Sequence, residues 1–212
     1  MSQPCDIARF RAAIVALIAM VALPTCVAPA NADALTCLAP VHPGEGAKSI
    51  LARWRGHARI AVLPEDENGS VRGIILFGSE PRKRVTVRFD DEKLTRVSSV
   101  SVDEPASLWQ AGRVRIGSSL ADVEAANGSP FIVYGWGSDA GGNVDFSAGK
   151  LSDASAGCSL SITFEPRKGV KTPAKLEGER PFDSGNADLW ALDPVVSLLE
   201  LVFPPAPVAK RP

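Results

Sequence analysis

The residues with the greatest potential for chemistry lie in a glycine-rich segment between Gly135 and Gly149. Trp136 and Asp139 stand among its glycines, and Tyr134 directly precedes it. The backbone N–H groups of a glycine-rich turn can bind a polar ligand together with a carboxylate. We therefore select Asp139, Trp136 and Tyr134 as candidate ligand-binding residues. The alternative interpretation is that Asp139 only makes hydrogen bonds within the turn.

Part of this segment also fits a dinucleotide-binding pattern. Residues 135–140, Gly-Trp-Gly-Ser-Asp-Ala, match G-x-G-x-x-[GA] after a predicted strand. A dinucleotide site needs a helix directly after this pattern, because the helix N-terminus holds the pyrophosphate. Residues 141–143, Gly-Gly-Asn, do not start a convincing helix. The match therefore does not predict a nucleotide cofactor.

Two other arrangements contain residue types that could serve in catalysis. Residues 183–185, Asp-Ser-Gly, resemble the active-site triplet of aspartic proteases, but Arg180 and Pro181 precede them where that family has an apolar strand. An Asx-type turn is the better interpretation. The two histidines, His42 and His57, fall in a predicted loop and at a helix end, without metal-ligand spacing. The sequence therefore predicts no catalytic residue, no metal ligand and no cofactor.

The composition is that of an ordinary globular chain. Of 212 residues, 45% are hydrophobic and 22% are charged, which is enough apolar material for one sizeable core or two small ones. The formal net charge is −1 and no basic run stands out. A broad electrostatic contact with nucleic acid or anionic lipid is therefore not expected.

Residues 1–32 have the order of a secretory signal peptide. Two arginines precede a short apolar stretch, residues 12–23, which Pro24 ends. That stretch is shorter than the roughly 20 apolar residues of a membrane-spanning helix, so we expect no transmembrane segment in the mature chain. Ala30-Asn31-Ala32 predicts cleavage near Ala32, with cleavage after Ala34 as an alternative. The expected location is periplasmic or secreted.

Cys26 offers an alternative fate, because a bacterial lipoprotein carries its lipid on a cysteine at such a position. The residues before a lipidated cysteine normally end in Gly, Ala or Ser, and Pro24-Thr25 fits that rule poorly. Cleavage near Ala32 without a lipid anchor is therefore the favoured prediction.

Cleavage removes two cysteines and leaves Cys37 and Cys158 in a compartment that permits disulfides. We predict one bond between them, closing a loop that contributes on the order of 4 kcal/mol in the chain-entropy model. Two buried free thiols are the alternative. Metal binding by the pair has less support, because neither histidine shows ligand spacing with them.

The hydrophobic periodicity predicts an α+β fold in which short helices pack on antiparallel β-sheet. The first unit, residues 33–104, combines a helix over 47–55 with strands over 58–63, 71–77, 85–89 and 97–102. The second unit, residues 105–204, combines a helix that starts after Ser119 with strands over 131–134, 157–164 and 195–203, and a polar surface segment over 167–188. The two units can be tandem copies of one helix-plus-meander arrangement. Residues 205–212 are expected to be a disordered tail.

The helix after Ser119 has the clearest boundaries in the chain. Ser119 can cap its N-terminus, and Asp122, three residues later, can complete a capping box. Asn127-Gly128 is typical of a left-handed helix end, and Pro130 prevents continuation. Leu120 should face the core.

These residues also carry a resemblance. The stretch IGSSLADVEAANGSPF at 116–131, followed by GWGSDAGG and Gly157-Cys158, resembles a family of exported proteobacterial proteins whose function is uncharacterised. More distantly, the series of glycine, cap, short helix, glycine, proline and strand resembles the β-lactamase-inhibitor-protein and outer-membrane-assembly lipoprotein superfamily. That resemblance implies an α+β fold and binding to another envelope protein rather than catalysis.

The sequence thus supports two functional hypotheses. The first is a non-catalytic binding or structural protein of the cell envelope, with another envelope protein as its partner. The second is a small-ligand-binding protein or enzyme that uses the glycine-rich turn at 135–149, with Asp139 as its principal residue.

Overall fold

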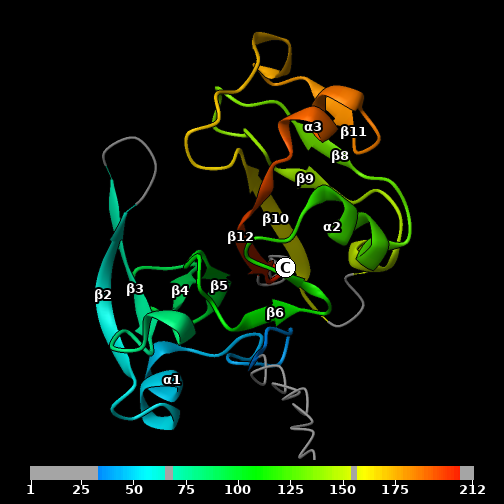
Figure 1. Ribbon diagram of the computed structural model, residues 1–212. Helices are drawn as coiled ribbons and strands as arrows, with labels where there is room; N and C mark the ends of the chain where they lie inside the picture. Colours follow the sequence, from blue (N-terminus) through cyan, green and yellow to red (C-terminus); the bar gives the residue numbers. More distant parts are fainter. Residues whose placement is uncertain (1–32, 65–68, 154–156, 206–212) are drawn as a thin grey trace, which may run out of the picture.

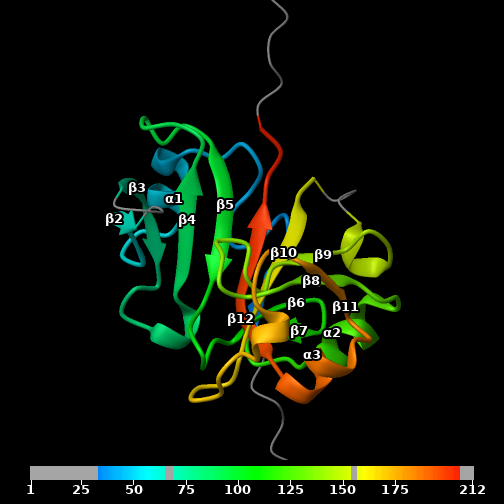
Figure 2. The ribbon, with the colours of Figure 1, turned by 90° about the horizontal axis from the view of Figure 1, so that it is seen from above.

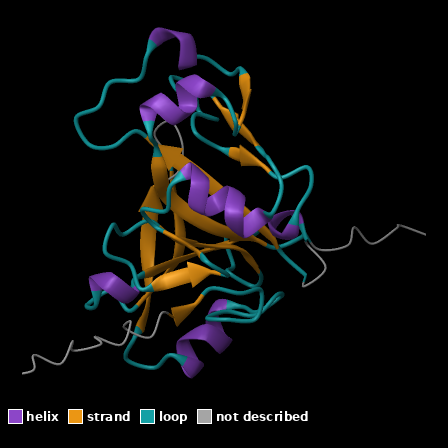
Figure 3. Ribbon diagram, turned by 45° about the vertical axis from the view of Figure 1, so that its right-hand side comes forward, coloured by secondary structure: helices purple, strands orange, loops and turns teal. Residues whose placement is uncertain are grey.

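The computed structural model describes residues 33–64, 69–153 and 157–205 (Figure 1). Within these ranges the chain has a mixed α+β fold in which sheet predominates (Figure 3). The helices are α1 (Ala47–Arg53), α2 (Leu120–Asn127) and α3 (Ala187–Leu192), with short 3-10 turns η2 (Pro81–Lys83), η3 (Lys150–Ser152) and η4 (Ala174–Leu176). The strands are β1 (Asp33–Ala34), β2 (Ala58–Pro64), β3 (Ser70–Leu76), β4 (Val85–Phe89), β5 (Val97–Val102), β6 (Trp109–Ala111), β7 (Val114–Arg115), β8 (Ile132–Tyr134), β9 (Val144–Asp145), β10 (Ser159–Glu165), β11 (Pro181–Asp183) and β12 (Val195–Val202).

The largest sheet has six strands in the order β10-β12-β5-β4-β3-β2, all antiparallel (Figures 1 and 2). Strands β2 to β5 follow one another in sequence and in space, as the predicted meander requires. The other two strands come from the C-terminal half, and β12 pairs directly with β5. Strands of both predicted units therefore share one sheet, and the division at residue 104 stays a prediction.

Smaller three-stranded sheets lie beside the large one. One has the order β11-β8-β9 and another the order β1-β6-β7, in which β1 and β6 run parallel. The strands of the predicted second unit are thus divided between sheets, because β10 and β12 join the large sheet while β8 and β9 pair with each other and with β11.

Alternation of side chains gives the six-stranded sheet two different faces. Val85 and Val87 of β4 and Val100 of β5 are at most 1% exposed and belong to the core. Thr86 and Ser101, their immediate neighbours along the strands, are half-buried on the opposite face. At these strands the sheet therefore buries apolar side chains on one face and places the hydroxyl-bearing Thr86 and Ser101 on the other.

Helix α2 has the boundaries that its sequence predicts. The Ser119 hydroxyl accepts a hydrogen bond from the Asp122 N–H at 3.2 Å, and the Asp122 carboxylate accepts one from the Ser119 N–H at 2.9 Å. Gly128 ends the helix in the left-handed conformation, with φ of 75°. Leu120 and Val123 are buried in the core. The predicted capping box is confirmed.

The polar segment over residues 167–188 is more structured than its composition indicates. It contains η4, with Leu176 fully buried, and strand β11, and it leads directly into α3. Asn186 caps α3 by accepting hydrogen bonds from the N–H groups of Asp188 and Leu189. Most of the segment is exposed, as expected of a surface segment, but its composition did not predict β11 or the start of α3. One cap and two buried leucines suffice to fold this short helix against an existing core.

Cys37 and Cys158 form a disulfide, with Cα atoms 5.5 Å apart and a sequence separation of 121. Cys158 is 3% exposed and lies in the core, so the bond ties the segment after β1 to the start of β10. The predicted signal peptide, with Cys5 and Cys26, lies outside the described residues. Among the helices that are described, none has the length and hydrophobicity to cross a membrane.

The disulfide should make a large contribution to stability. Replacing both Cys37 and Cys158 by alanine should lower the free energy of unfolding by about 4 kcal/mol, because the unfolded chain regains the entropy of a long open loop. Urea denaturation of the variant and of the oxidised protein would measure the difference. Free thiols in the unreduced, unfolded wild-type protein would contradict the bond.

The capping box should make stability depend on acidic pH. Hydrogen bonds from the backbone N–H and hydroxyl of Ser119 lower the pKa of the Asp122 carboxyl. A carboxyl with a lowered folded-state pKa stabilises the fold above its unfolded pKa, and this contribution disappears as pH falls through the folded value. The stability difference between wild type and Asp122→Ala should therefore be largest near neutrality and shrink below about pH 4. Asp139→Ala, at an exposed position, is the matched control.

Candidate functional site

A groove lies over the polar face of the six-stranded sheet, with a volume of about 590 Å³. Both edge strands contribute to it, so the sheet curves enough for β2 and β10 to line one hollow (Figure 1). Its strand residues are Leu63 and Pro64 of β2, Thr86 and Arg88 of β4, Ser101 of β5, Leu198 and Glu200 of β12, and Ser161 and Thr163 of β10. Arg84, Asp103 and Asn143 complete the lining.

A row of directly opposed polar side chains crosses the floor of the groove. Thr86 lies opposite Ser101, Ser101 opposite Glu200, and Glu200 opposite Ser161. Neighbouring strands are about 4.8 Å apart, so the row spans about 14 Å. It places one carboxylate between hydroxyl groups, all four side chains being half-buried.

Both basic residues of the described lining have a hydrogen-bond or ion-pair partner. The Arg88 guanidinium donates a hydrogen bond to the Pro64 carbonyl oxygen at 2.9 Å. Arg84 forms a 3.8 Å ion pair with Glu104, which does not line the groove.

The acidic residues differ from the basic ones in this respect. Within the part of the chain that is described, the carboxylates of Glu200 and Asp103 have neither a hydrogen bond nor an ion pair. The charged groups of the described lining that lack any partner are therefore the two carboxylates, on β12 and just after β5. Arg88 keeps its positive charge, because its acceptor is a neutral carbonyl.

The glycine-rich segment supplies one wall of the groove through Asn143. The Thr163 hydroxyl donates a hydrogen bond to the Asn143 side-chain oxygen at 2.8 Å, and the two residues form an isolated β-bridge. Next to it, the Phe164 N–H donates to the Gly142 carbonyl oxygen at 2.8 Å. The segment is thus fastened to β10, where it borders the groove.

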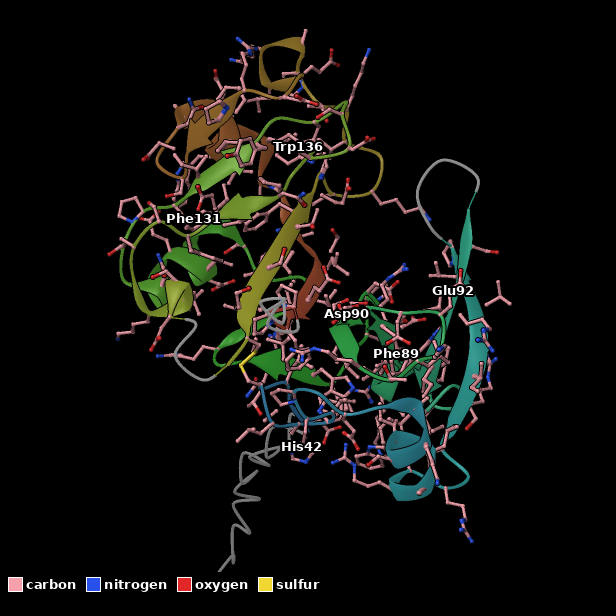
Figure 4. The ribbon with its side chains drawn as sticks, turned by 180° about the vertical axis from the view of Figure 1, so that it is seen from behind. His42, Phe89, Asp90, Glu92, Phe131 and Trp136 are labelled. Carbon is pink, nitrogen blue, oxygen red and sulfur yellow. A yellow bond between two sulfur atoms is a disulfide. The ribbon has the colours of Figure 1, made fainter. Side chains whose placement is uncertain are left out.

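The candidate ligand-binding residues Asp139, Trp136 and Tyr134 do not line the groove. Trp136 is 6% exposed, and its indole N–H donates to the Phe164 carbonyl oxygen at 3.0 Å, so its ring belongs to the core. Figure 4 shows Trp136 on the side of the molecule that holds Phe131, away from the β2–β3 hairpin. Tyr134 is half-buried and its backbone N–H donates to Asn143, whereas Asp139 is exposed. A ligand role for these three residues stays a prediction.

The other chemical motifs have structural explanations. The Asp183 carboxylate accepts a hydrogen bond from the Gly185 N–H at 2.8 Å, which is the predicted Asx turn. Ser184 between them is fully buried, and its hydroxyl donates to the Glu124 carboxylate of α2 at 2.7 Å.

Burial raises the pKa of Glu165, which ends β10 two residues beyond the groove residue Thr163. Among the described residues, no three His, Cys, Asp or Glu side chains are grouped to hold a metal ion.

Comparison with known proteins adds no assignment: no family model, no curated protein and no solved structure matches this chain. The groove therefore has to be interpreted from its own geometry. Its principal residues, Glu200 and Ser101, were missed because each strand shows only that its alternate residues are polar. Their meeting depends on the pairing of β5 with β12.

The wall formed by the glycine-rich segment should depend on Gly142. A Cβ atom there would overlap the Phe164 carbonyl oxygen and the Trp136 ring, at a φ of +75°. Gly137 also has a positive φ, +91°, but no atom lies near the position of its missing Cβ. Gly137→Ala should therefore lower the free energy of unfolding by about 1 kcal/mol, through backbone strain alone. Gly142→Ala should lower it by at least about 2 kcal/mol more, because of the overlap. Equal losses of stability in the two variants, measured by thermal unfolding, would contradict this account of the wall.

Proposed function

We propose that this chain is an exported, non-catalytic binding protein of the cell envelope, and that the groove over the six-stranded sheet is its binding surface. The observation that carries the proposal is the row of polar side chains from Thr86 to Ser161 on a curved sheet face, with the Glu200 carboxylate left without a partner. Unpartnered polar groups converging in a hollow are what a binding site supplies to its ligand.

Two further observations support the exported, protein-binding part of this proposal. The signal-like order of residues 1–32 and the Cys37–Cys158 bond fit an oxidising compartment outside the cytoplasm. The resemblance to the β-lactamase-inhibitor-protein and outer-membrane-assembly lipoprotein superfamily implies helix-plus-sheet units and a protein partner. Fold resemblance alone is a weak reason for function, so the groove carries the argument.

A second candidate function is small-ligand binding or catalysis by the glycine-rich turn at 135–149. One contact favours a link between the turn and the groove, namely the hydrogen bond between Asn143 and Thr163. Asn143 lines the groove, whereas Asp139 is exposed and does not line it.

Filling the groove should prevent capture of a partner. The purified exported protein, immobilised, should retain a specific envelope protein from extract, and Ser101→Trp should lose it because the indole occupies the centre of the polar row. Ser79→Trp, at an exposed position outside the groove, should retain it. Thermal unfolding would verify that both variants are folded. Equal capture by the two variants, or hydrolase activity without any specific partner, would contradict the proposal.

A further inference from the structure

The charges of the groove indicate which chemistry it can bind. Among the described residues that line it, four are charged, and the two basic ones contact the Pro64 carbonyl oxygen and the Glu104 carboxylate. The two acidic ones, Glu200 and Asp103, remain unpaired within the described residues. A carboxylate accepts hydrogen bonds and donates none, so its ligand must bring donors and, most favourably, positive charge.

We propose that the groove binds an extended peptide segment through a lysine side chain, whose ammonium group is held by Glu200. This inference rests on the groove being the binding surface, as proposed above, and it adds the class of ligand.

Glu200 is the central acceptor because of its place in the row. Ser101 and Ser161 lie directly opposite it on the two neighbouring strands. An ammonium group has three N–H donors, so it can bind the Glu200 carboxylate together with the hydroxyl oxygen of one of these serines. Asp103 follows the end of β5 and lines the same hollow, so it adds negative charge without blocking the row.

A peptide matches the rest of the lining better than a free polyamine does. Arg88 uses a single N–H for Pro64, and its guanidinium has further donors that can bind carbonyl oxygens. A peptide main chain supplies such oxygens, whereas a polyamine has only donors. The floor spans about 14 Å, which accommodates about four residues of an extended chain at roughly 3.3 Å per residue.

The lining also disfavours a drug-like apolar ligand. Sites for such molecules are lined mainly by hydrophobic and aromatic side chains. Among the described residues of this lining, Leu63, Pro64 and Leu198 are apolar and none is aromatic, and hydroxyl, amide and charged groups form the remainder. Leu198 lies two residues before Glu200 on β12, where it can contact the methylene groups of a lysine side chain.

The test uses the full exported protein and a fluorescein-labelled peptide, acetyl-Ser-Gly-Ser-Lys-Ser-Gly-Ser-amide, in fluorescence anisotropy at low salt. Matched probes replace the lysine by norleucine or by acetyl-lysine, and free spermidine serves as competitor. Glu200→Gln keeps the size of the side chain and removes its charge. Glu92→Gln, on the exposed turn after β4 and outside the groove, is the control.

The lysine peptide should bind, and the norleucine and acetyl-lysine peptides should bind at least tenfold more weakly, as should the lysine peptide to Glu200→Gln. Glu92→Gln should bind like the wild type. Equal binding of the three peptides, no binding of any, or an unchanged affinity of Glu200→Gln would overturn the inference. Spermidine binding that depends on Glu200, without peptide binding, would also overturn it and identify a free amine as ligand.

These outcomes are separable from failure of the proposed function. If Ser101→Trp abolishes capture of the envelope partner while the lysine peptide does not bind, the groove is the binding surface and the ligand class is wrong. If Ser101→Trp leaves capture unchanged and the lysine peptide still depends on Glu200, the groove binds peptide but is not the surface for that partner.

Discussion

The antiparallel pairing of β5 with β12 is the interaction on which the architecture depends. It aligns Val102 with Leu199, Ser101 with Glu200, Val100 with Leu201 and Ser99 with Val202. One register therefore buries Val100, Val102, Leu199 and Leu201 in the core and places Ser101 and Glu200 in the groove. A shift by one residue would exchange the two faces, burying Glu200 among apolar side chains, so the core strongly selects this register.

Several contacts outside the paired residues hold this register. The Phe203 N–H donates to the Ser98 carbonyl oxygen at 2.8 Å, which continues the pairing beyond β12. Arg96 donates to the Pro204 carbonyl oxygen at 2.6 Å, and the disulfide connects Cys37 with the residue before β10. The two halves of the chain are therefore joined by backbone, side-chain and covalent links. The shape of the groove is coupled to the stability of the whole sheet.

The sequence could predict those features of the fold that residues close together in the chain determine. Ser119 and Asp122 are three residues apart and form the capping box, and the alternation at Val85 and Val87 marks a strand with one buried face. The groove could not be predicted, because Ser101 and Glu200 meet only through β-pairing between distant segments. Helix α3 was missed for a related reason, since a six-residue helix owes its stability to packing rather than to its own propensity.

The glycine-rich segment shows why chemically promising residues need not form the site. Tryptophan side chains often contact ligands, yet the indole N–H of Trp136 donates to the Phe164 carbonyl oxygen and its ring is in the core. The glycines permit this close packing, since at Gly142 even a Cβ atom would overlap the backbone of β10. Glu200 is an unremarkable residue in sequence, but its carboxylate has no partner among the described residues. The capacity to bind depends on which polar groups the fold leaves unsatisfied, and the Glu200 carboxylate lies on the sheet that the glycine-rich segment borders.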